Sequence, residues 1–126
     1  MFTRVRFHTL ADMRDEPLTY ASAAGQREGT VILKLAGPLT LSTMFGLQDE
    51  LRSIKPQVLV LDLSESPYMD SAGLGLVMNY YVSAEGHGRK LLLAGMNERI
   101  AALLDMTKVQ EILQTFPSVA EAEASL

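Results

Sequence analysis

Hydrophobic positions follow two spacings from residue 18 onward, one typical of strands and the other of helices. Short aliphatic runs between glycine or proline breaks predict strands at 18–24, 30–36, 57–63 and 90–94. Between these runs apolar residues recur three or four positions apart, which predicts helices beginning after Ser42, at Ser71 and after Asn97. Strands and helices therefore alternate after an initial pair of strands.

The runs at 57–63 (QVLVLDL) and 90–94 (KLLLA) are almost continuously apolar, as are strands covered on both faces of a parallel sheet. A glycine-bounded turn between the first two strands predicts an antiparallel hairpin instead. Residues 109–116 are ambiguous between a short helical turn and a short last strand, and Ser118 is expected to cap a final helix running through Ala124. The order β-β-α-β-α-β-α-(β)-α predicts an α/β fold with a small mixed, mainly parallel sheet.

Composition narrows the class of protein. The 126 residues suit one domain, and an apolar share of 48% supplies a core without disulfides, since the chain has no cysteine. A net charge of −4 and a sequence pI of about 5.1 give no basic footprint for nucleic acid. The apolar runs are far shorter than the roughly 20 residues of a membrane helix, and the start lacks the apolar stretch of a signal peptide. We expect a cytoplasmic protein with no direct contact to nucleic acid and no membrane insertion.

Residues 1–17 differ from the rest of the chain, because three arginines and a histidine make them basic. The alternation of side chains over 3–9 fits an added edge strand. A poorly ordered N-terminal arm is the preferred interpretation. The domain itself is assigned to 18–126.

Residues that carry catalysis are scarce. His8 and His87 have no partner at ligand spacing, and Gly73-Leu74-Gly75 lacks the third glycine of a dinucleotide fingerprint. Asp62 lies near the end of a buried strand, as does the phospho-accepting aspartate of receiver domains, but no acidic pair follows an earlier strand to hold Mg²⁺. Asp62 is instead expected to fix the loop that follows it. We expect no enzymatic activity, no cofactor and no metal site.

The segment Pro67-Tyr68-Met69-Asp70-Ser71-Ala72-Gly73-Leu74-Gly75 lies near the carboxyl edge of the predicted sheet, where α/β proteins tend to place function. A plain N-cap at Asp70 or Ser71 is the simplest interpretation. Gly73 and Gly75, however, weaken a helix where it begins and leave its backbone open to close approach. A serine at a helix N-terminus is also well placed to carry phosphate, because free N–H groups and the helix dipole stabilise the added charge.

These residues resemble the STAS domain family, named for sulfate transporters and anti-sigma factor antagonists. The resemblance covers about 30–126. It runs through Val58–Leu63 and the Asp-Ser-x-Gly-Leu-Gly motif of Tyr68–Gly75, and it resumes in Lys90–Gly95 and Asn97–Thr107. It implies helices packed mainly on one face of the sheet, and a phosphoacceptor serine directly after the aspartate, at Ser71.

The function that this resemblance implies is a phosphorylation-gated protein-binding module, an anti-sigma factor antagonist. Such a protein binds an anti-sigma factor with serine kinase activity and thereby releases a sigma factor. Phosphorylation by that kinase ends the binding, and a serine phosphatase restores it. Two positions depart from the family pattern. Thr40 stands where many members have an aspartate, and Ala72 replaces the second hydroxyl residue of the pair that begins at Ser71.

A second function keeps the fold and changes the partner: a STAS subunit of a transporter ATPase complex, or a stressosome-like scaffold protein. For either function we expect partner contacts from the turn, the loop around Thr40 and the outer side of the following helix. The proposed partner-binding residues are Asp70, Ser71, Gly73, Gly75, Thr40, Leu76 and Tyr80.

The interpretation of Leu76 and Tyr80 depends on which face of their helix is buried. Leu74, Val77, Met78 and Tyr81 define the expected inward face, and Leu76 and Tyr80 fall off it. The pair is therefore either an exposed contact patch or core covered by a neighbouring helix.

Overall fold

The structure, a computed structural model, describes residues 16–126. Of the basic arm expected at 1–17, all but Glu16 and Pro17 lie outside the described residues. The described part forms, in chain order, β1 (Thr19–Ala24), β2 (Thr30–Ala36), α2 (Met44–Ser53), β3 (Val58–Glu65), α3 (Ser71–Gly86), β4 (Lys90–Ala94), α4 (Glu98–Met106), the 3₁₀ turn η1 (Val109–Glu111), β5 (Gln114–Phe116) and α5 (Val119–Ala124). This is the predicted order, with the ambiguous segment 109–116 forming both a helical turn and a last strand.

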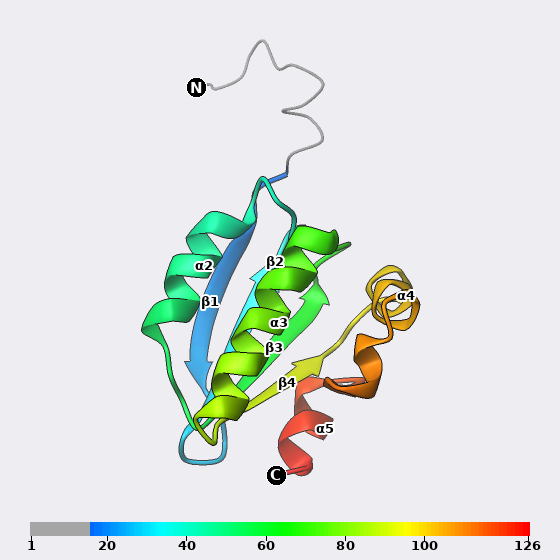
Figure 1. Ribbon diagram of the computed structural model, residues 1–126. Coiled ribbons are helices and arrows are strands. Elements are labelled where there is room, and N and C mark those ends of the chain that lie inside the picture. Colours follow the sequence, from blue (N-terminus) through cyan, green and yellow to red (C-terminus); the bar gives the residue numbers. More distant parts are fainter. Residues whose placement is uncertain (1–15) are drawn as a thin grey trace.

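The strands of the described part form one sheet in the order β1-β2-β3-β4-β5 (Figure 1). β1 pairs with β2 in antiparallel register, and the other neighbouring pairs are parallel. The predicted mixed, mainly parallel sheet is therefore confirmed. Because β2, β3 and β4 point the same way, their carboxyl ends meet at one edge of the sheet. The loops that follow these strands consequently lie close together.

Most of the core lies between one face of the sheet and the helices α2, α3 and α4. Its buried cluster combines sheet and helix residues, among them Leu33, Leu59, Leu47, Val77 and Ile100. A second, smaller cluster lies on the opposite face beneath α5, which packs on β3, β4 and β5. The expectation that helices pack mainly on one face is confirmed, with α5 as the exception.

The start of α2 differs from the prediction. Ser42 was expected to cap this helix, but the helix begins at Met44, and the residue at its N-cap position is Thr43. The Thr43 side chain makes no capping hydrogen bond to the helix. Its Oγ1 instead donates to the carbonyl oxygen of Pro38 at 2.8 Å and accepts from the amide of Thr40 at 2.9 Å. The Thr43 hydroxyl therefore stabilises the preceding loop rather than the helix, so the predicted Ser42 cap is wrong.

The buried surface of α3 is also wider than the predicted face. Leu74 and Val77 are buried as expected, whereas Met78 is only partly buried. Leu76 and Tyr80 are 6% and 9% exposed, because α2 lies beside α3 and covers that flank. Of the two interpretations of this pair, core is therefore the one that the structure supports, and an exposed contact patch is wrong.

Apolar residues occur on several sides of α3 because this helix packs both on the sheet, where it contacts β4, and against α2 on one flank. It has 16 residues and is the longest helix of the described part. Nowhere in residues 16–126 is a helix both long enough and apolar enough to cross a bilayer.

Candidate functional site

The candidate site lies where two loops meet at the carboxyl edge of the sheet. We call residues 67–75 the Ser71 turn and residues 37–43 the Leu39 loop. The amide of Leu39 donates to the carbonyl oxygen of Tyr68 at 3.1 Å, and the amide of Asp70 donates to that of Leu39 at 3.2 Å. These bonds extend the parallel pairing of β2 and β3 by one isolated bridge, so the backbones of the two loops are joined directly.

Asp70 connects the two loops through both of its carboxylate oxygens. Oδ1 accepts a hydrogen bond from the amide of Gly73 at 2.8 Å, which makes Asp70 the N-cap of α3. Oδ2 accepts from the amide of Leu41 at 3.1 Å, across 29 residues of sequence. The N-cap predicted for this helix is therefore Asp70 rather than Ser71, and the same side chain also fixes the Leu39 loop.

Ser71 is the first residue of α3 and is exposed. Within residues 16–126 its hydroxyl forms no hydrogen bond with another residue. The oxygen that caps the helix belongs to Asp70 instead. The amides of the first helical turn lie beside it and are only partly satisfied. The predicted placement of Asp70 and Ser71 at the start of a helix, beside the loop around Thr40, is confirmed.

The two glycines of the turn have different roles. Gly73 is buried, and a Cβ at this position would lie 2.3 Å from the carbonyl oxygen of Leu39 and 2.9 Å from its Cγ. Gly73 is therefore needed for the close contact between α3 and the Leu39 loop, and its burial makes it unsuited to the expected partner contact. A Cβ at the exposed Gly75 would meet nothing within 4 Å, so this position is open to an approaching molecule.

Thr40, the residue at the family's aspartate position, is part of a hydroxyl cluster in the Leu39 loop. Its Oγ1 lies 3.1 Å from Oγ of Ser42 and 3.4 Å from Oγ1 of Thr43. Thr40 is half-buried beside the Ser71 turn and carries no charge. A threonine here therefore shapes the loop without adding a carboxylate near Ser71.

Contacts from α4 support the Ser71 turn from the other side, and the sequence analysis did not find them. Asn97 caps α4 as predicted, with its Oδ1 accepting from the amide of Ile100 at 2.9 Å. Its side-chain amide also donates to the carbonyl oxygen of Pro67 at 2.8 Å. The guanidinium of Arg99 lies 4.9 Å from the centroid of the Tyr68 ring, a cation–π distance. Nothing in the spacing of these residues signals contacts between segments 30 residues apart.

Two large apolar side chains are exposed near this edge of the sheet. Leu41, within the Leu39 loop, is 59% exposed, and Phe45, in the first turn of α2, is 58% exposed. The loop was among the expected contact regions, but Phe45 was missed, although helical spacing places it off the side of α2 that Leu47 and Leu51 bury. Figure 1 shows that α2 and α3 both begin at the end of the sheet where the loops meet.

Among residues 16–126, no group of three or more His, Cys, Asp and Glu side chains is placed to hold a metal ion. Asp62 has the structural role predicted for it, because its Oδ1 accepts from the amide of Ser64 at 3.0 Å. His87 follows the end of α3, where its Nδ1 lies 2.8 Å from the carbonyl oxygen of Ser83. The site therefore combines the exposed hydroxyl of Ser71, the carboxylate that caps α3, the hydroxyl cluster of the Leu39 loop and two exposed apolar side chains.

Removal of the Asp70 carboxylate tests this arrangement. We expect Asp70→Ala to lower the free energy of unfolding by about 2 kcal/mol, because the variant loses both the N-cap bond and the bond to Leu41. Asp70→Asn keeps one acceptor and should lose less, and Ser71→Ala should be nearly neutral. Urea unfolding of the three variants measures these differences. A larger loss for Ser71→Ala than for Asp70→Ala would identify the serine, not the aspartate, as the structural cap.

Comparison with known proteins places this site in context. The model of the family described as the STAS domain matches residues 21–122. Over 57 residues the chain is 35% identical to the anti-sigma-B factor antagonist of Listeria monocytogenes, an alignment covering 45% of this chain and 50% of that protein. The chain thus spans about half the length of this relative. It is 28% identical over 90 residues to the anti-sigma-B factor antagonist of Bacillus subtilis, covering 70% of this chain and 83% of the relative.

Solved structures show the same fold. A putative anti-sigma factor antagonist from Thermotoga maritima superposes with a TM-score of 0.76 at 22% identity, covering 84% of this chain and 92% of that one. A sulfate transporter family protein from Wolinella succinogenes superposes with a TM-score of 0.67 at 27% identity, covering 79% and 85%. The same fold therefore occurs in a protein named as an anti-sigma factor antagonist and in a sulfate transporter family protein.

Proposed function

This chain belongs to the STAS domain family, and on that basis we propose that it is an anti-sigma factor antagonist whose binding is controlled by phosphorylation of Ser71. Its partner is an anti-sigma factor with serine kinase activity, and binding releases a sigma factor. The chain itself is a binding module in the cytoplasm and not an enzyme.

The observation that carries this proposal is the presentation of Ser71. The hydroxyl is exposed at the first position of α3, while Asp70 provides the cap and holds the neighbouring loop. A serine whose hydroxyl is not needed for the fold can be modified without loss of structure. The curated relatives named anti-sigma-B factor antagonists support the choice of partner class.

The phosphorylation cycle requires chemistry that the partners supply. The kinase transfers the terminal phosphoryl group of ATP to Oγ of Ser71, the hydroxyl proton leaves to a base on the kinase, and ADP is released. A serine phosphatase then hydrolyses the phosphate ester with water and returns the free hydroxyl and inorganic phosphate. The partial positive charge at the N-terminus of α3 favours the added phosphate within the fold.

The alternative is a STAS subunit of a transporter complex or a scaffold protein. The likeness to the Wolinella succinogenes transporter-family protein supports it. The curated relatives reported above favour the sigma-factor role. Both functions use the same fold, so the partner distinguishes them.

A binding and phosphorylation assay tests the proposal. The purified 126-residue protein is mixed with anti-sigma kinases from its source, with and without Mg-ATP, and phosphate incorporation is mapped by mass spectrometry. We expect binding without ATP, phosphate on Ser71 with ATP, and retained binding but no phosphate for Ser71→Ala. Absence of binding to every kinase tested would contradict the proposal and leave the transporter or scaffold function as the alternative. Phosphate gained from ATP alone would contradict the assignment as a non-enzyme.

The exposed apolar margin provides a second test. Phe45→Ala should weaken binding to the anti-sigma kinase at least about fivefold, because truncation of an aromatic contact that matters for binding costs over about 1 kcal/mol. The variant should unfold at the same urea concentration as the parent, since Phe45 is 58% exposed. Met106→Ala is the matched control, because Met106 is 77% exposed on α4. Equal effects of both substitutions on affinity, measured by calorimetry, would remove Phe45 from the interface.

A further inference from the structure

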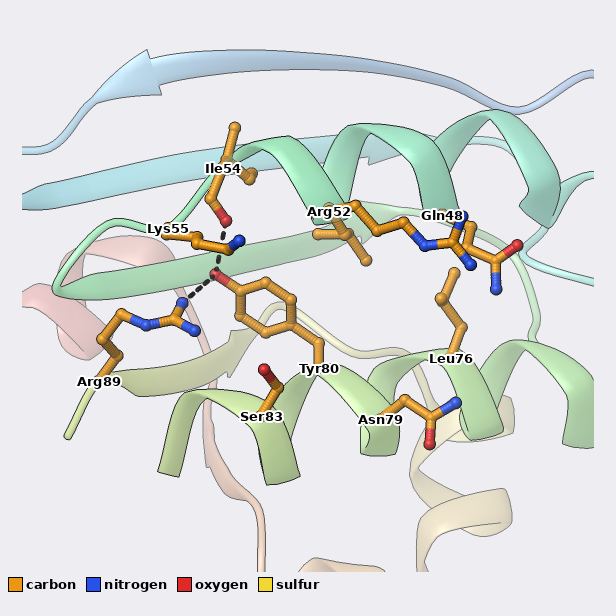
Figure 2. Close-up of a pocket in the computed structure, with 10 residues that line it drawn as sticks. Gln48, Arg52, Ile54, Lys55, Leu76, Asn79, Tyr80, Ser83 and Arg89 are labelled. Atoms are coloured by element: carbon orange, nitrogen blue, oxygen red, sulfur yellow. Dashed lines mark hydrogen bonds between the residues drawn. The ribbon is translucent and has the colours of Figure 1, made fainter. Parts of the chain in front are cut away.

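A pocket lies between α2 and α3, distinct from the Ser71 turn. It has a volume of about 310 Å³, and residues of α2, of the segment after α2, of α3 and of the segment before β4 line it (Figure 2). Small-molecule sites commonly begin at roughly this size. Its lining residues on α3 begin at Leu76, whereas Ser71 is the first residue of that helix.

Three cations surround this pocket, and none of its lining residues is acidic. Arg52 comes from the last turn of α2, Lys55 from the segment after that helix, and Arg89 from the segment before β4. Arg52 also lies 3.7 Å from Asp49 on its own helix, but both groups are largely exposed, so this ion pair holds it only weakly. The chain as a whole has a net charge of −4, so the positive charge of this pocket is opposite in sign to that of the whole protein.

The Tyr80 hydroxyl contacts Arg89 and points toward the end of the pocket from which Lys55 also comes (Figure 2). It donates to the carbonyl oxygen of Ile54 at 3.4 Å and accepts from the guanidinium of Arg89 at 3.5 Å, and both bonds are long. Burial of the ring raises the pKa of Tyr80 above its ordinary value, although the charge of Arg89 opposes this. The hydroxyl therefore remains a proton donor at neutral pH, and its present bonds are weak enough to be exchanged.

The remaining lining combines apolar and neutral polar groups. Leu51, Leu76 and the Tyr80 ring are buried and form an apolar floor. Asn79 and Ser83 of α3 add neutral hydrogen-bonding groups to one wall. An apolar floor with a cationic rim suits a ligand that has a small apolar body and a negatively charged group.

We infer that the pocket between α2 and α3 binds a small organic phosphate monoester, with its phosphate held by Lys55, Arg89 and the Tyr80 hydroxyl and its body resting on the apolar floor. A phosphate fits this rim better than a carboxylate. It carries close to two negative charges at neutral pH and has enough oxygens to accept bonds from all three groups at once. Arg52 adds a further cation to the lining, and its side chain extends toward Gln48 (Figure 2). This inference does not rest on the proposed function, because it uses neither Ser71 nor the anti-sigma partner.

Titration of the full chain with phenyl phosphate tests the inference. Amide shifts in ¹H–¹⁵N NMR spectra should change saturably at Lys55, Asn79 and Arg89, and inorganic phosphate should bind more weakly because it has no apolar body. Lys55→Gln and Arg89→Gln should each weaken the affinity about tenfold, as expected for loss of one charge-assisted bond. Tyr80→Phe should weaken it less, and added salt should reduce it throughout.

Arg27→Gln is the matched control. It removes one cation from the exposed turn between β1 and β2, and it should leave the affinity unchanged. Urea unfolding checks that each variant keeps its fold, since Lys55 is exposed and Arg89 only half-buried. Absence of saturable shifts at millimolar phenyl phosphate would overturn the inference. So would an equal loss of affinity in Arg27→Gln and Lys55→Gln, which would indicate attraction by overall charge alone.

Discussion

A Gly73→Ala variant should lose about 2 to 3 kcal/mol of unfolding free energy, a large part of the stability of a small domain. The added methyl group would lie 2.3 Å from the carbonyl oxygen of Leu39, which is backbone and cannot turn aside like a side chain. Relief of this contact requires α3 and the Leu39 loop to separate. Such a shift also strains the bond from Leu41 to Asp70, so the loss of stability should be accompanied by weaker binding of the partner.

Gly75→Ala provides the matched control, two residues further along the same helix. A Cβ at Gly75 would meet nothing within 4 Å, and alanine favours a helix over glycine by about 0.5 to 1 kcal/mol. The two substitutions should therefore change the unfolding free energy in opposite directions. Urea unfolding of both variants measures this difference. Similar effects of the two variants would show that the contact between α3 and Leu39 is not as close as described.

Phosphorylation of Ser71 should lower affinity for the anti-sigma kinase about 100-fold, which corresponds to about 2.7 kcal/mol. The phosphate adds roughly −1.5 to −2 charges and must lose water when a partner covers it. Leu41 and Phe45, exposed near the same edge, cannot compensate for that loss. At the N-terminus of α3 the charge is itself favourable by about 0.3 to 1 kcal/mol. The melting temperature should therefore stay the same or rise slightly.

This local mechanism differs from a conformational switch in its NMR spectrum. Phosphorylated and unphosphorylated protein should show similar amide shifts outside residues 70–80. Ser71→Ala, treated with kinase and Mg-ATP, is the control and should keep full affinity. Widespread shift changes across β2, β3 and β4 would contradict local repulsion and favour a rearrangement of the sheet.

Much of the fold was predictable because its signals are local. The β-branched run of 30–36 and the apolar run of 57–63 appear as β2 and as most of β3. The caps at Asn97 and Ser118 accept hydrogen bonds from amides three residues later, as their residue types suggest. Each of these signals lies within a few residues of the structure it predicts.

The errors arose where tertiary contacts decide the outcome. Helical spacing gave α3 one buried face, but α2 on its flank also buries Leu76 and Tyr80. The N-cap position of α2 is Thr43 and not Ser42. The Thr43 hydroxyl is bound to the carbonyl oxygen of Pro38 within the Leu39 loop, a contact that the spacing of residues does not show. The need for glycine at position 73 comes from the backbone of Leu39, 34 positions earlier, a contact that spacing along the chain cannot show.

The candidate site was predictable in its residues but not in its construction. The Asp70-Ser71 pair was found from the turn and its resemblance to the family. The second bond of Asp70, to Leu41, depends on how two loops meet across 29 residues. The support from Asn97 and Arg99 likewise depends on where α4 packs. The position of Ser71 in the sequence therefore identified the hydroxyl of the site. The contacts that hold its turn in place depend on how the loops and α4 pack.

The most direct test of the central claim is to map the surface that the anti-sigma kinase covers. Isotope-labelled protein is titrated with the unlabelled kinase in the absence of ATP, and cross-saturation identifies the contacted amides by NMR. The account predicts contact at Leu41, Phe45, Ser71 and Gly75, at the end of the molecule where α2 and α3 begin. Contact confined to α4, α5 or the edge strand β1, with the Ser71 turn free, would contradict it.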